Sequence, residues 1–564
     1  MKDVGEGEED VDACASTRAS RDARADEDDV INALAPTAHA THATRRSRAR
    51  RRMMMMMTDE HCGERRARRA TRMRVDARAT PRTRERTTPR TTARRRAFAR
   101  AGVRARDARM NAMDGDGGAA NAIDDVRALV SWSASRGARG SGLTVSLDGG
   151  GDAGRGLETT REVTRGDAVL STPLTAGIVD DAAGHPESAR EVMREAPWGV
   201  RLACRLLQEK KLGEASVYAP YVKTLPTRVP TSPVHYADDA LAEVQYPPAV
   251  TEIKEMRAAC RKWHETLRER APEALGDAFF DYEMFADAVG VVHSRTYGVA
   301  SADDNAGYFR ALLPLADMLN HGGDIVTSVT RDETTGELTD MTVEATDNIA
   351  WSRLDDDGTI QFAATRDIPE GEEALMSYGE RSNDHFLIYY GFAPDNNPHD
   401  DCVLFSNLEH AMVWHSVAHP ELWEGPEGTV REKVANAAYE EVTKALEADG
   451  SADAKLAASE PRLKVLGYGR VDARLLSAFA AMYAGTEATG DVDGPVCGDE
   501  LKFARADVAA RCEQLLAQMP TTFEEDVDAL RSGAFRDDAE RVRVIYRACK
   551  KKILRETLDM FKLT

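Results

Sequence analysis

The chain has little of what marks a metal-cluster protein, a disulfide-rich protein or a membrane protein. Its 564 residues include only 8 cysteines, none in a C-x-x-C pair, which excludes a clustered zinc site and a dense disulfide framework. No apolar run approaches the roughly 18 residues that a membrane span needs. Aromatic residues make up 6% of the chain, and the sequence contains no internal repeat. The length predicts three or four structural units, and the cysteine usage fits a reducing compartment.

Charge is divided unevenly along the chain. Residues 1–113 hold 28 basic and 17 acidic residues, which leaves 47 basic and 78 acidic residues for the other 451. The first part therefore carries a net charge of +11 and the body −31. A body this acidic repels the phosphates of nucleic acid, so we expect no nucleic-acid binding by the folded part. The same charge favours basic segments of partner proteins.

The N-terminal segment has the composition of an organelle transit peptide. The stretch from Arg65 to Met113 contains 18 arginines spread among Thr, Ala and Pro, with only three acidic residues. A basic arm that binds nucleic acid has a similar composition, and this alternative stays open. The run Met53 to Met57 offers several translation starts. We therefore treat residues 1–113 as an extension outside the fold.

The body shows an order of strands, helices, strands and helices. Short β-type runs such as Ala168–Ser171 come first, and Trp198–Leu212 then has apolar residues at helical spacing. Strand patterns such as Leu338–Ala345 return after residue 311, and the last part is mainly helical. The sequence thus predicts an α+β fold. The predicted units are residues 114–185, 186–290, 291–395 and 396–564.

Four local patterns contain residues suited to ligand binding. In the first, Gly154-Arg155-Gly156-Leu157, a backbone without side-chain bulk can approach a ligand closely, although taken alone the glycines favour an ordinary β-turn, since such turns are abundant. In the second, Ser294-Arg295-Thr296-Tyr297 closes a helix and offers an arginine and a hydroxyl to a carboxylate. Helix ends also collect such residues for capping.

The third and fourth patterns bring polar and aromatic groups together. In Ala316 to Gly323, an apolar run delivers Asp317, Asn320 and His321 into a glycine turn. In the fourth, Ser377-Tyr378 is followed by the aromatic cluster Tyr389 to Phe392, which can form a narrow channel for an alkylamine. A capped turn and an aromatic core edge are the structural alternatives.

Taken in order, these patterns resemble the SET-domain protein methyltransferases, in the branch of the Rubisco large-subunit lysine methyltransferases. The matching segments are Gly154–Leu157, Tyr218–Tyr221 with Leu225-Pro226, Ser294-Arg295, Ala316–His321, Ser377-Tyr378, Arg381–Asn383 and Tyr390–Phe392. The resemblance implies a β-rich SET domain with a pseudoknot and a helical insert, followed by an all-helical C-terminal domain that binds the substrate.

The resemblance also implies a site. It implies S-adenosylmethionine as the methyl donor, Tyr378 as the catalytic residue and no metal. The residues implied to bind the cofactor are Ala153, Gly154, Arg155, Arg295, Asp317, Asn320, His321, Tyr378 and Tyr390; those implied to line the lysine channel are Ser294 and Tyr297. The segment through Asn320 and His321 is expected to pass under the loop that carries Tyr378. Two departures from the family pattern lie beside this site, Gly322-Gly323 and Asp384-His385.

The function implied is methylation of a lysine in a non-histone protein by a monomeric enzyme. The expected compartment is the chloroplast stroma, with the mitochondrion or the cytoplasm as alternatives, and candidate acceptors include the Rubisco large subunit and the plastid aldolase. Two other functions remain open. Relatives in this branch differ in the acceptor, so the target is alternatively a histidine, or the chain is a non-catalytic SET scaffold that binds a protein partner.

Overall fold

The computed structural model describes residues 117–147, 155–300, 308–331, 338–354, 358–484 and 499–562. The predicted transit segment and two predicted cofactor-binding residues, Ala153 and Gly154, lie outside these ranges. Within them, no helix is both long and apolar enough to cross a membrane.

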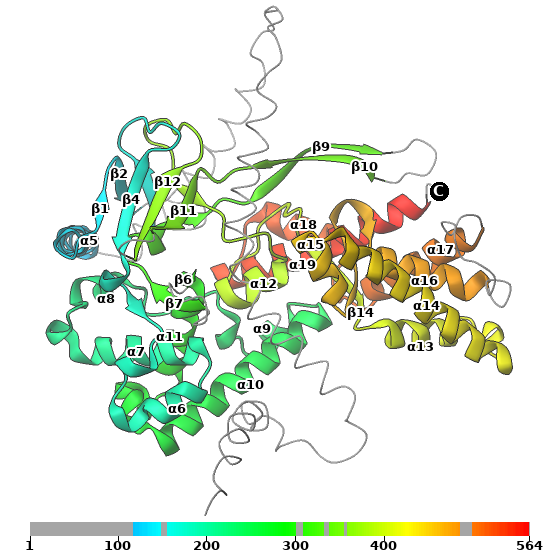
Figure 1. The fold of residues 1–564 in the computed structure, drawn as a ribbon, viewed down its shortest axis with the longest axis horizontal. Helices are drawn as coiled ribbons and strands as arrows, with labels where there is room; N and C mark the ends of the chain where they lie inside the picture. The colour runs from blue at the N-terminus through cyan, green and yellow to red at the C-terminus, as the bar shows by residue number, and fades with distance from the viewer. Residues whose placement is uncertain are drawn as a thin grey trace, which may run out of the picture.

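A curled set of small sheets forms the first half of the molecule (Figure 1). The largest has six strands in the order β1-β4-β12-β11-β13-β8, and three smaller sheets have the orders β2-β3, β5-β7-β6 and β10-β9. The strands are β1 Arg139–Gly140, β2 Leu143–Ser146, β3 Gly156–Thr159, β4 Ala168–Pro173, β5 Ile178–Val179, β6 Thr296–Ala300, β7 Tyr308–Leu312, β8 Asn320–His321, β9 Asp324–Arg331, β10 Leu338–Ala345, β11 Ile349–Arg353, β12 Thr359–Ala364 and β13 Leu375–Met376.

A group of helices lies between β5 and β6 in the sequence and packs below the sheets in Figure 1. The helices are α6 Arg190–Glu195, α7 Trp198–Leu212, α8 Ala219–Thr224, α9 Asp238–Ala242, α10 Pro247–Arg270 and α11 Tyr282–Arg295, while α5 Gly117–Ser135 precedes β1. The spacing of apolar residues predicted α7 with its bounds, because residues such as Leu202 and Leu206 recur on one face and are fully buried. Asp281 caps α11 by accepting hydrogen bonds from the backbone of Glu283 and Met284.

The second half is mainly helical, as predicted. Its helices are α12 Asn383–His385, α13 Leu408–Ala418, α14 Pro426–Asp449, α15 Ala452–Ser459, α16 Ala473–Ala484, α17 Asp499–Ala517, α18 Phe523–Ser532 and α19 Asp538–Lys562. It also contains a three-stranded sheet of β14 Asp401–Phe405, β15 Leu463–Leu466 and β16 Arg470–Val471, so the expectation of an all-helical region was incomplete. β15 and β16 have only four and two residues, which is too short for a clear alternating pattern.

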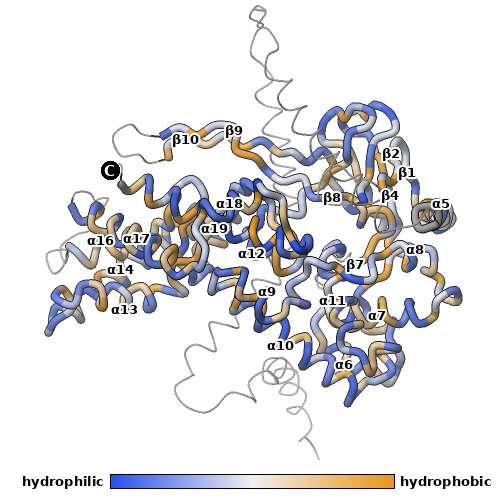
Figure 2. The backbone as a smooth tube through the Cα atoms, turned by 180° about the vertical axis from the view of Figure 1, so that it is seen from behind, coloured by the Kyte–Doolittle hydropathy of each residue, from blue (hydrophilic) through white to orange (hydrophobic). Residues whose placement is uncertain are grey.

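Two hydrophobic cores meet next to the segment that contains Ser377, Tyr378 and the aromatic cluster Tyr389 to Phe392. The first core joins the sheets to the helical insert, and the second joins the C-terminal helices to one another. Met376 belongs to the first core, whereas Leu387 and Ile388, only eleven and twelve residues later, belong to the second. The tube in Figure 2 shows apolar segments gathered inside each half. The loop that carries Tyr378 therefore crosses from one core to the other.

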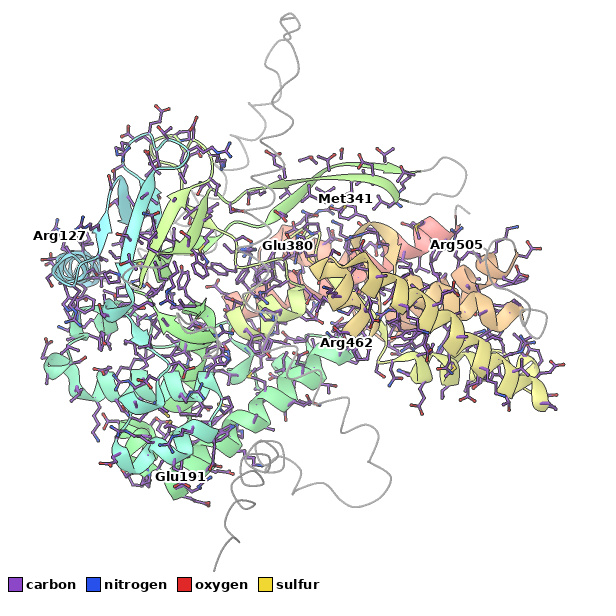
Figure 3. The ribbon with its side chains drawn as sticks, viewed as in Figure 1. Arg127, Glu191, Met341, Glu380, Arg462 and Arg505 are labelled. Carbon is purple, nitrogen blue, oxygen red and sulfur yellow. The ribbon has the colours of Figure 1, made fainter. Side chains whose placement is uncertain are left out.

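The hairpin of β9 and β10 projects from the sheets and runs beside the C-terminal helices (Figure 1). Figure 3 shows Met341 on this hairpin and Glu380 at the junction between the two halves. Arg331, at the end of β9, donates to the backbone carbonyl of Tyr468 at 2.6 Å. The hairpin is thus tied to the C-terminal half.

Candidate functional site

The site is built where two distant segments lie side by side. β8 pairs in parallel with β13, with Asn320 opposite Leu375 and His321 opposite Met376. The backbone N–H of Gly322 continues this pairing by donating to the carbonyl of Met376 at 3.0 Å. The crossing expected from the resemblance therefore places Asn320 and His321 directly beside the strand that leads to Tyr378.

Tyr378 is held by both its side chain and its backbone. Its hydroxyl donates to the carbonyl of Leu319 at 2.6 Å, and its N–H donates to Nδ1 of His321 at 3.1 Å. Because Nδ1 accepts this bond, a neutral His321 carries its proton on Nε2. Burial raises the pKa of Tyr378, so its hydroxyl stays protonated at neutral pH. Tyr378 is therefore a positioned hydroxyl group and not a base.

An aromatic cluster surrounds Tyr378. The ring of Tyr390 stacks on that of Tyr378, with 5.2 Å between centroids and 27° between planes. Further rings in contact within the cluster belong to His321, Phe386 and Phe392. Residues Phe386–Tyr390 form a π-helical turn, a rare conformation that is frequent at functional sites. The predicted aromatic cluster is thus present and encloses the catalytic candidate.

Tyr297 binds a second backbone carbonyl of the segment Ala316–Leu319. Its buried hydroxyl donates to the carbonyl of Ala316 at 2.7 Å and lies 4.0 Å from the sulfur of Met376. Burial raises the pKa of Tyr297, and the neighbouring Tyr378 adds to the rise. Ser294 instead donates to the carbonyl of Val291 in its own helix, at 3.1 Å. Of the two predicted channel residues, Tyr297 therefore contacts the site segment, whereas the hydroxyl of Ser294 bonds within its own helix.

Asp317 sits on a strained turn. It belongs to a short 3-10 turn, Ala316–Met318, and the preceding Leu315 has a φ of +66°, a region that L-residues rarely adopt. The last turn of α11 brings Arg295 to this turn, where its Nη1 donates to the Asp317 carbonyl at 3.0 Å. The turn thereby places a carboxylate and a guanidinium in one buried location.

The carboxylate of Asp317 is fully buried and incompletely paired. Its closest ion-pair contact is Arg295 Nη1 at 3.7 Å, neither oxygen has a hydrogen bond of good geometry within the part of the chain that the structure describes, and the Tyr221 hydroxyl is near enough to help lower its pKa. Burial raises the pKa of Asp317, while Arg295 and Arg155 oppose the rise. Tyr221 faces the same carboxylate, and both its burial and the charge of Asp317 raise its pKa. Tyr221 belongs to a segment that matches the family pattern but was not predicted as a site residue.

Asn320 connects the predicted glycine turn to the sheet. Its side-chain amide donates to the carbonyl of Arg155 at 3.2 Å and to Glu373 Oε1 at 2.8 Å. A Cβ atom on Gly156 would lie 2.7 Å from Glu373 Oε1 and 2.9 Å from Asn320 Nδ2. Any other residue at position 156 would displace the ends of these two side chains and disturb the bond between them. Glu373, whose pKa burial raises, was not predicted as a site residue, since an acidic residue before a short strand carries no specific signal.

A hollow lies beside the site, and two clusters, one of which lines this hollow, have the composition of metal ligands. The hollow is lined by His321, Gly323, Asp324, Ser377, Gly379, Glu380, Phe386, Pro394, Asn397 and His399. The clusters are His415 with His419 and Asp507, and Asp324 with Glu380 and His399. In the first cluster Trp423 donates to Nδ1 of His415 at 2.9 Å, so the proton of a neutral His415 is on Nε2, which then cannot ligate a metal. In the second, His399 already bonds Asp324 at 2.8 Å.

Comparison with known sequences gives a consistent but partial match. No family model matches the chain. The chain is 28% identical over 284 residues to the actin-histidine N-methyltransferase of Canis lupus familiaris, which covers 48% of this chain and 43% of that protein. The human enzyme of the same name gives 27% identity over 284 residues with the same coverage. The match thus spans less than half the length of these curated relatives.

Comparison with solved structures covers more of the molecule. The SET domain of LSMT bound to lysine and AdoHcy has a TM-score of 0.53 and 17% identity, over 78% of this chain and 91% of that chain. Rubisco LSMT bound to AdoMet has a TM-score of 0.52 with the same identity and coverage. At this identity the likeness concerns the fold. It confirms the resemblance seen in the sequence motifs: the chain has the SET-domain fold of the Rubisco LSMT structures.

Proposed function

We propose that the chain is a protein methyltransferase that uses S-adenosylmethionine and transfers its methyl group to a lysine side chain of another protein. One observation carries the proposal. Two tyrosine hydroxyls, those of the half-buried Tyr378 and the buried Tyr297, are anchored on the carbonyls of Leu319 and Ala316, and these carbonyls flank the incompletely paired carboxylate of Asp317.

The residues present fit this cofactor. Its amino acid end carries an ammonium and a carboxylate, and the buried atoms around Asp317 with unused bonding capacity include the Asp317 oxygens and Nε of Arg295. Asp317 would hold the ammonium, and Arg295 the carboxylate. The hollow lined by His321 and Phe386 suits a flat adenine ring. When bound, the cofactor supplies an electrophilic methyl group on a sulfonium sulfur.

The tyrosines prepare the acceptor. A lysine ammonium has no lone pair, and a buried channel lowers its pKa because burial disfavours the charged form. Each tyrosine hydroxyl has one hydrogen, and Tyr378 and Tyr297 both donate theirs to backbone carbonyls. Their remaining lone pairs accept N–H bonds from an amine and weak C–H···O contacts from adjacent carbons. The residues thereby orient the amine lone pair, and alignment supplies most of the rate enhancement.

This pattern of acceptors favours lysine over histidine. A neutral lysine amine presents two N–H groups beside its lone pair, whereas a neutral imidazole presents one N–H. Two hydroxyls restricted to accepting therefore match the amine better. Histidine is the second candidate acceptor, because the sequence relatives reported above are actin-histidine N-methyltransferases.

The deciding experiment is transfer of labelled methyl from S-adenosylmethionine by the full chain into a protein extract, followed by mass mapping of the modified residue. Tyr378→Phe should lose about 100-fold or more in rate, because alignment is lost. Tyr483→Phe is the matched control, since its hydroxyl bonds Asp507 in the C-terminal half and should leave the rate unchanged. A mapped methyl-histidine would overturn lysine specificity. Cofactor binding without transfer to any protein would favour a non-catalytic scaffold.

We also propose a plastid location and an abundant stromal acceptor, such as the Rubisco large subunit or the plastid aldolase. The arginine-rich segment before residue 114 supports import, and the acidic body favours a basic target surface. Residues 1–116 fused to a fluorescent protein should direct it to plastids. Mitochondrial or cytoplasmic fluorescence would contradict the location and would remove the stromal acceptors from consideration.

A further inference from the structure

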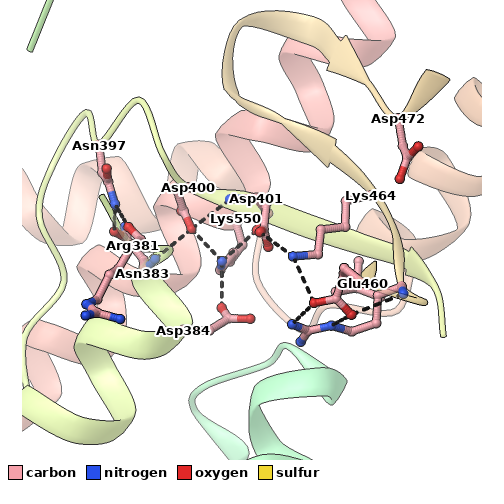
Figure 4. A network of polar contacts seen from close by, with 12 residues as sticks. Arg381, Asn383, Asp384, Asn397, Asp400, Asp401, Glu460, Lys464, Asp472 and Lys550 are labelled. Carbon is pink, nitrogen blue, oxygen red and sulfur yellow. Dashed lines mark hydrogen bonds and ion pairs between the residues drawn. The ribbon is translucent and has the colours of Figure 1, made fainter. Parts of the chain in front are cut away.

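We infer that the C-terminal helix α19 positions the Tyr378 loop through the buried ammonium of Lys550. The inference deepens the proposed function and rests on it for its activity measurement. Lys550 lies far from Tyr378 in the sequence, and the polar groups between them form a continuous set of contacts, most of which are drawn in Figure 4.

Lys550 uses all the hydrogen-bonding capacity of its side chain at the junction of the two halves. Its side chain is completely buried, and its Nζ lies 2.6 Å from Asp384 Oδ1, 2.7 Å from Asp400 Oδ1 and 2.7 Å from the Asp401 carbonyl. An ammonium has three N–H donors, so each has an acceptor. Burial alone would lower the pKa of Lys550, but Asp384 and Asp400 outweigh it and keep the pKa well above its usual value. Lys550 is therefore charged.

The acceptors of Lys550 lie on the segment that follows Tyr378. Asp384 is in α12, which begins five residues after Tyr378, and Tyr546 of α19 also donates to Asp384 at 2.7 Å. Asp384 is one of the two departures from the family pattern noted in the sequence. Its role here is to bind α19.

A second path leads from Asp400 to the backbone of Tyr378. Asp400 Oδ1 accepts from the N–H of Asn383 at 2.9 Å. The amide of Asn397 then donates to Asn383 Oδ1 at 2.9 Å and to the carbonyl of Arg381 at 2.7 Å. Arg381 Nε donates to the carbonyl of Tyr378 at 3.1 Å. Every step from Lys550 to the catalytic candidate is thus a hydrogen bond or an ion pair.

The loop needs such support because a glycine gives its backbone conformational freedom next to Tyr378. Gly379, directly after Tyr378, has a φ of +109°, a conformation that only glycine adopts readily. A flexible residue next to a group that must align with the acceptor amine would allow Tyr378 to shift. A displacement of about 1 Å in an active site can cost roughly 100-fold in rate.

The test compares two buried or half-buried lysines of the same polar network. Lys550→Met should lower kcat about 10- to 100-fold and leave the Kd for S-adenosylmethionine near the wild-type value. The control is Lys464→Met. Lys464 lies 2.9 Å from Asp401 Oδ2 and 3.7 Å from Glu460 Oε2 in the same network, and these ion pairs point away from the Tyr378 loop in the sequence, so kcat should be unchanged.

Two further variants separate positioning from unfolding. Lys550→Met leaves carboxylates buried without their cation, so the double variant Lys550→Met with Asp400→Asn relieves part of that cost. Asn397→Ala breaks the path without touching a charge and should reproduce the loss of kcat with little loss of Tm. If both residues act through one path, the kcat loss in Lys550→Met with Asn397→Ala should be smaller than the product of the single losses.

Hydrogen exchange gives a measurement that does not depend on activity. Backbone amides of residues 377–386 should exchange faster in the Lys550 variants and in Asn397→Ala than in wild type or Lys464→Met. Unchanged exchange in this segment, or equal loss of kcat in Lys464→Met, would overturn the inference. If the wild-type chain transfers no methyl group, the proposed function fails, while the exchange comparison still decides whether α19 holds the loop.

Discussion

Buried charges are treated differently in the two halves of the molecule. In the C-terminal half, Asp526 is fully buried and accepts hydrogen bonds from Arg547 at 2.8 Å and Lys551 at 2.5 Å. In the SET half, Asp317 is equally buried, yet neither of its oxygens has a hydrogen bond of good geometry within the residues that the structure describes. Buried polar groups in folded proteins are normally satisfied, so the pairing of Asp526 is that of a structural carboxylate, whereas the weak pairing of Asp317 is what the proposed cofactor site would use.

The largest expected effect comes from a substitution of Asp526. Asp526→Asn removes the negative charge that Arg547 and Lys551 share, and should lower the free energy of unfolding by about 3–5 kcal/mol. Chemical denaturation followed by circular dichroism measures this. The affinity for S-adenosylmethionine of the folded variant should match that of wild type. A loss below about 1 kcal/mol would remove the distinction between the two carboxylates.

Asp317→Asn, in contrast, should weaken cofactor binding and leave the stability of the fold intact. Loss of the charged acceptor should weaken binding of S-adenosylmethionine about 10- to 100-fold, measured by calorimetry. Burial raises the pKa of Asp317, so the ionised carboxylate at pH 7 costs stability in the free protein. The variant should therefore keep or exceed the wild-type Tm without cofactor. A destabilised variant with unchanged affinity would make Asp317 a structural residue like Asp526.

The motifs of the SET half were readable from the sequence, whereas the C-terminal contacts were not. Asp317, Asn320 and His321 occur within five residues, and Ser377-Tyr378 precedes a compact aromatic cluster, so local spacing placed them together. Lys550 meets Asp384 and Asp400 across 166 and 150 residues. No local pattern indicates such a pairing, because a lysine on an amphipathic helix ordinarily faces solvent. Glu373 and Tyr221 were not predicted as site residues either, because no local pattern in the sequence links them to the site.

A third prediction concerns pH and the junction between the halves. Burial raises the pKa of Asp400 to about 6 against the pull of Lys550, and the neighbouring charges of Asp384 and Asp401 add to the rise. A carboxyl group with a raised folded-state pKa contributes stability below its unfolded pKa of about 3.9, and this contribution is lost as the pH rises through about 6.

Asp400→Asn should therefore flatten the pH dependence of stability. As the pH rises from 4.5 to 7.5, the Tm of wild type should fall relative to the Tm of the variant, because only the wild type ionises at this position. Differential scanning calorimetry at both pH values measures the change. Asp395→Asn, at an exposed residue, is the control and should follow wild type. A parallel decline in wild type and Asp400→Asn would assign the pH dependence to other groups.

The smallest effect comes from the helix cap at the start of α18, the helix that also contains Asp526. Thr522 and Glu525 form a capping box at the start of α18, in which Thr522 Oγ1 accepts from the Glu525 N–H at 3.2 Å and Glu525 Oε2 accepts from the Thr522 N–H at 2.7 Å. Thr522→Ala should cost about 1 kcal/mol of stability, and Thr522→Ser should cost less because the hydroxyl is kept. Neither change should alter kcat or cofactor affinity, since α19 and Lys550 still hold the Tyr378 loop. A fall in kcat with Thr522→Ala alone would mean that the C-terminal half acts on the site through its general stability and not through the path from Lys550.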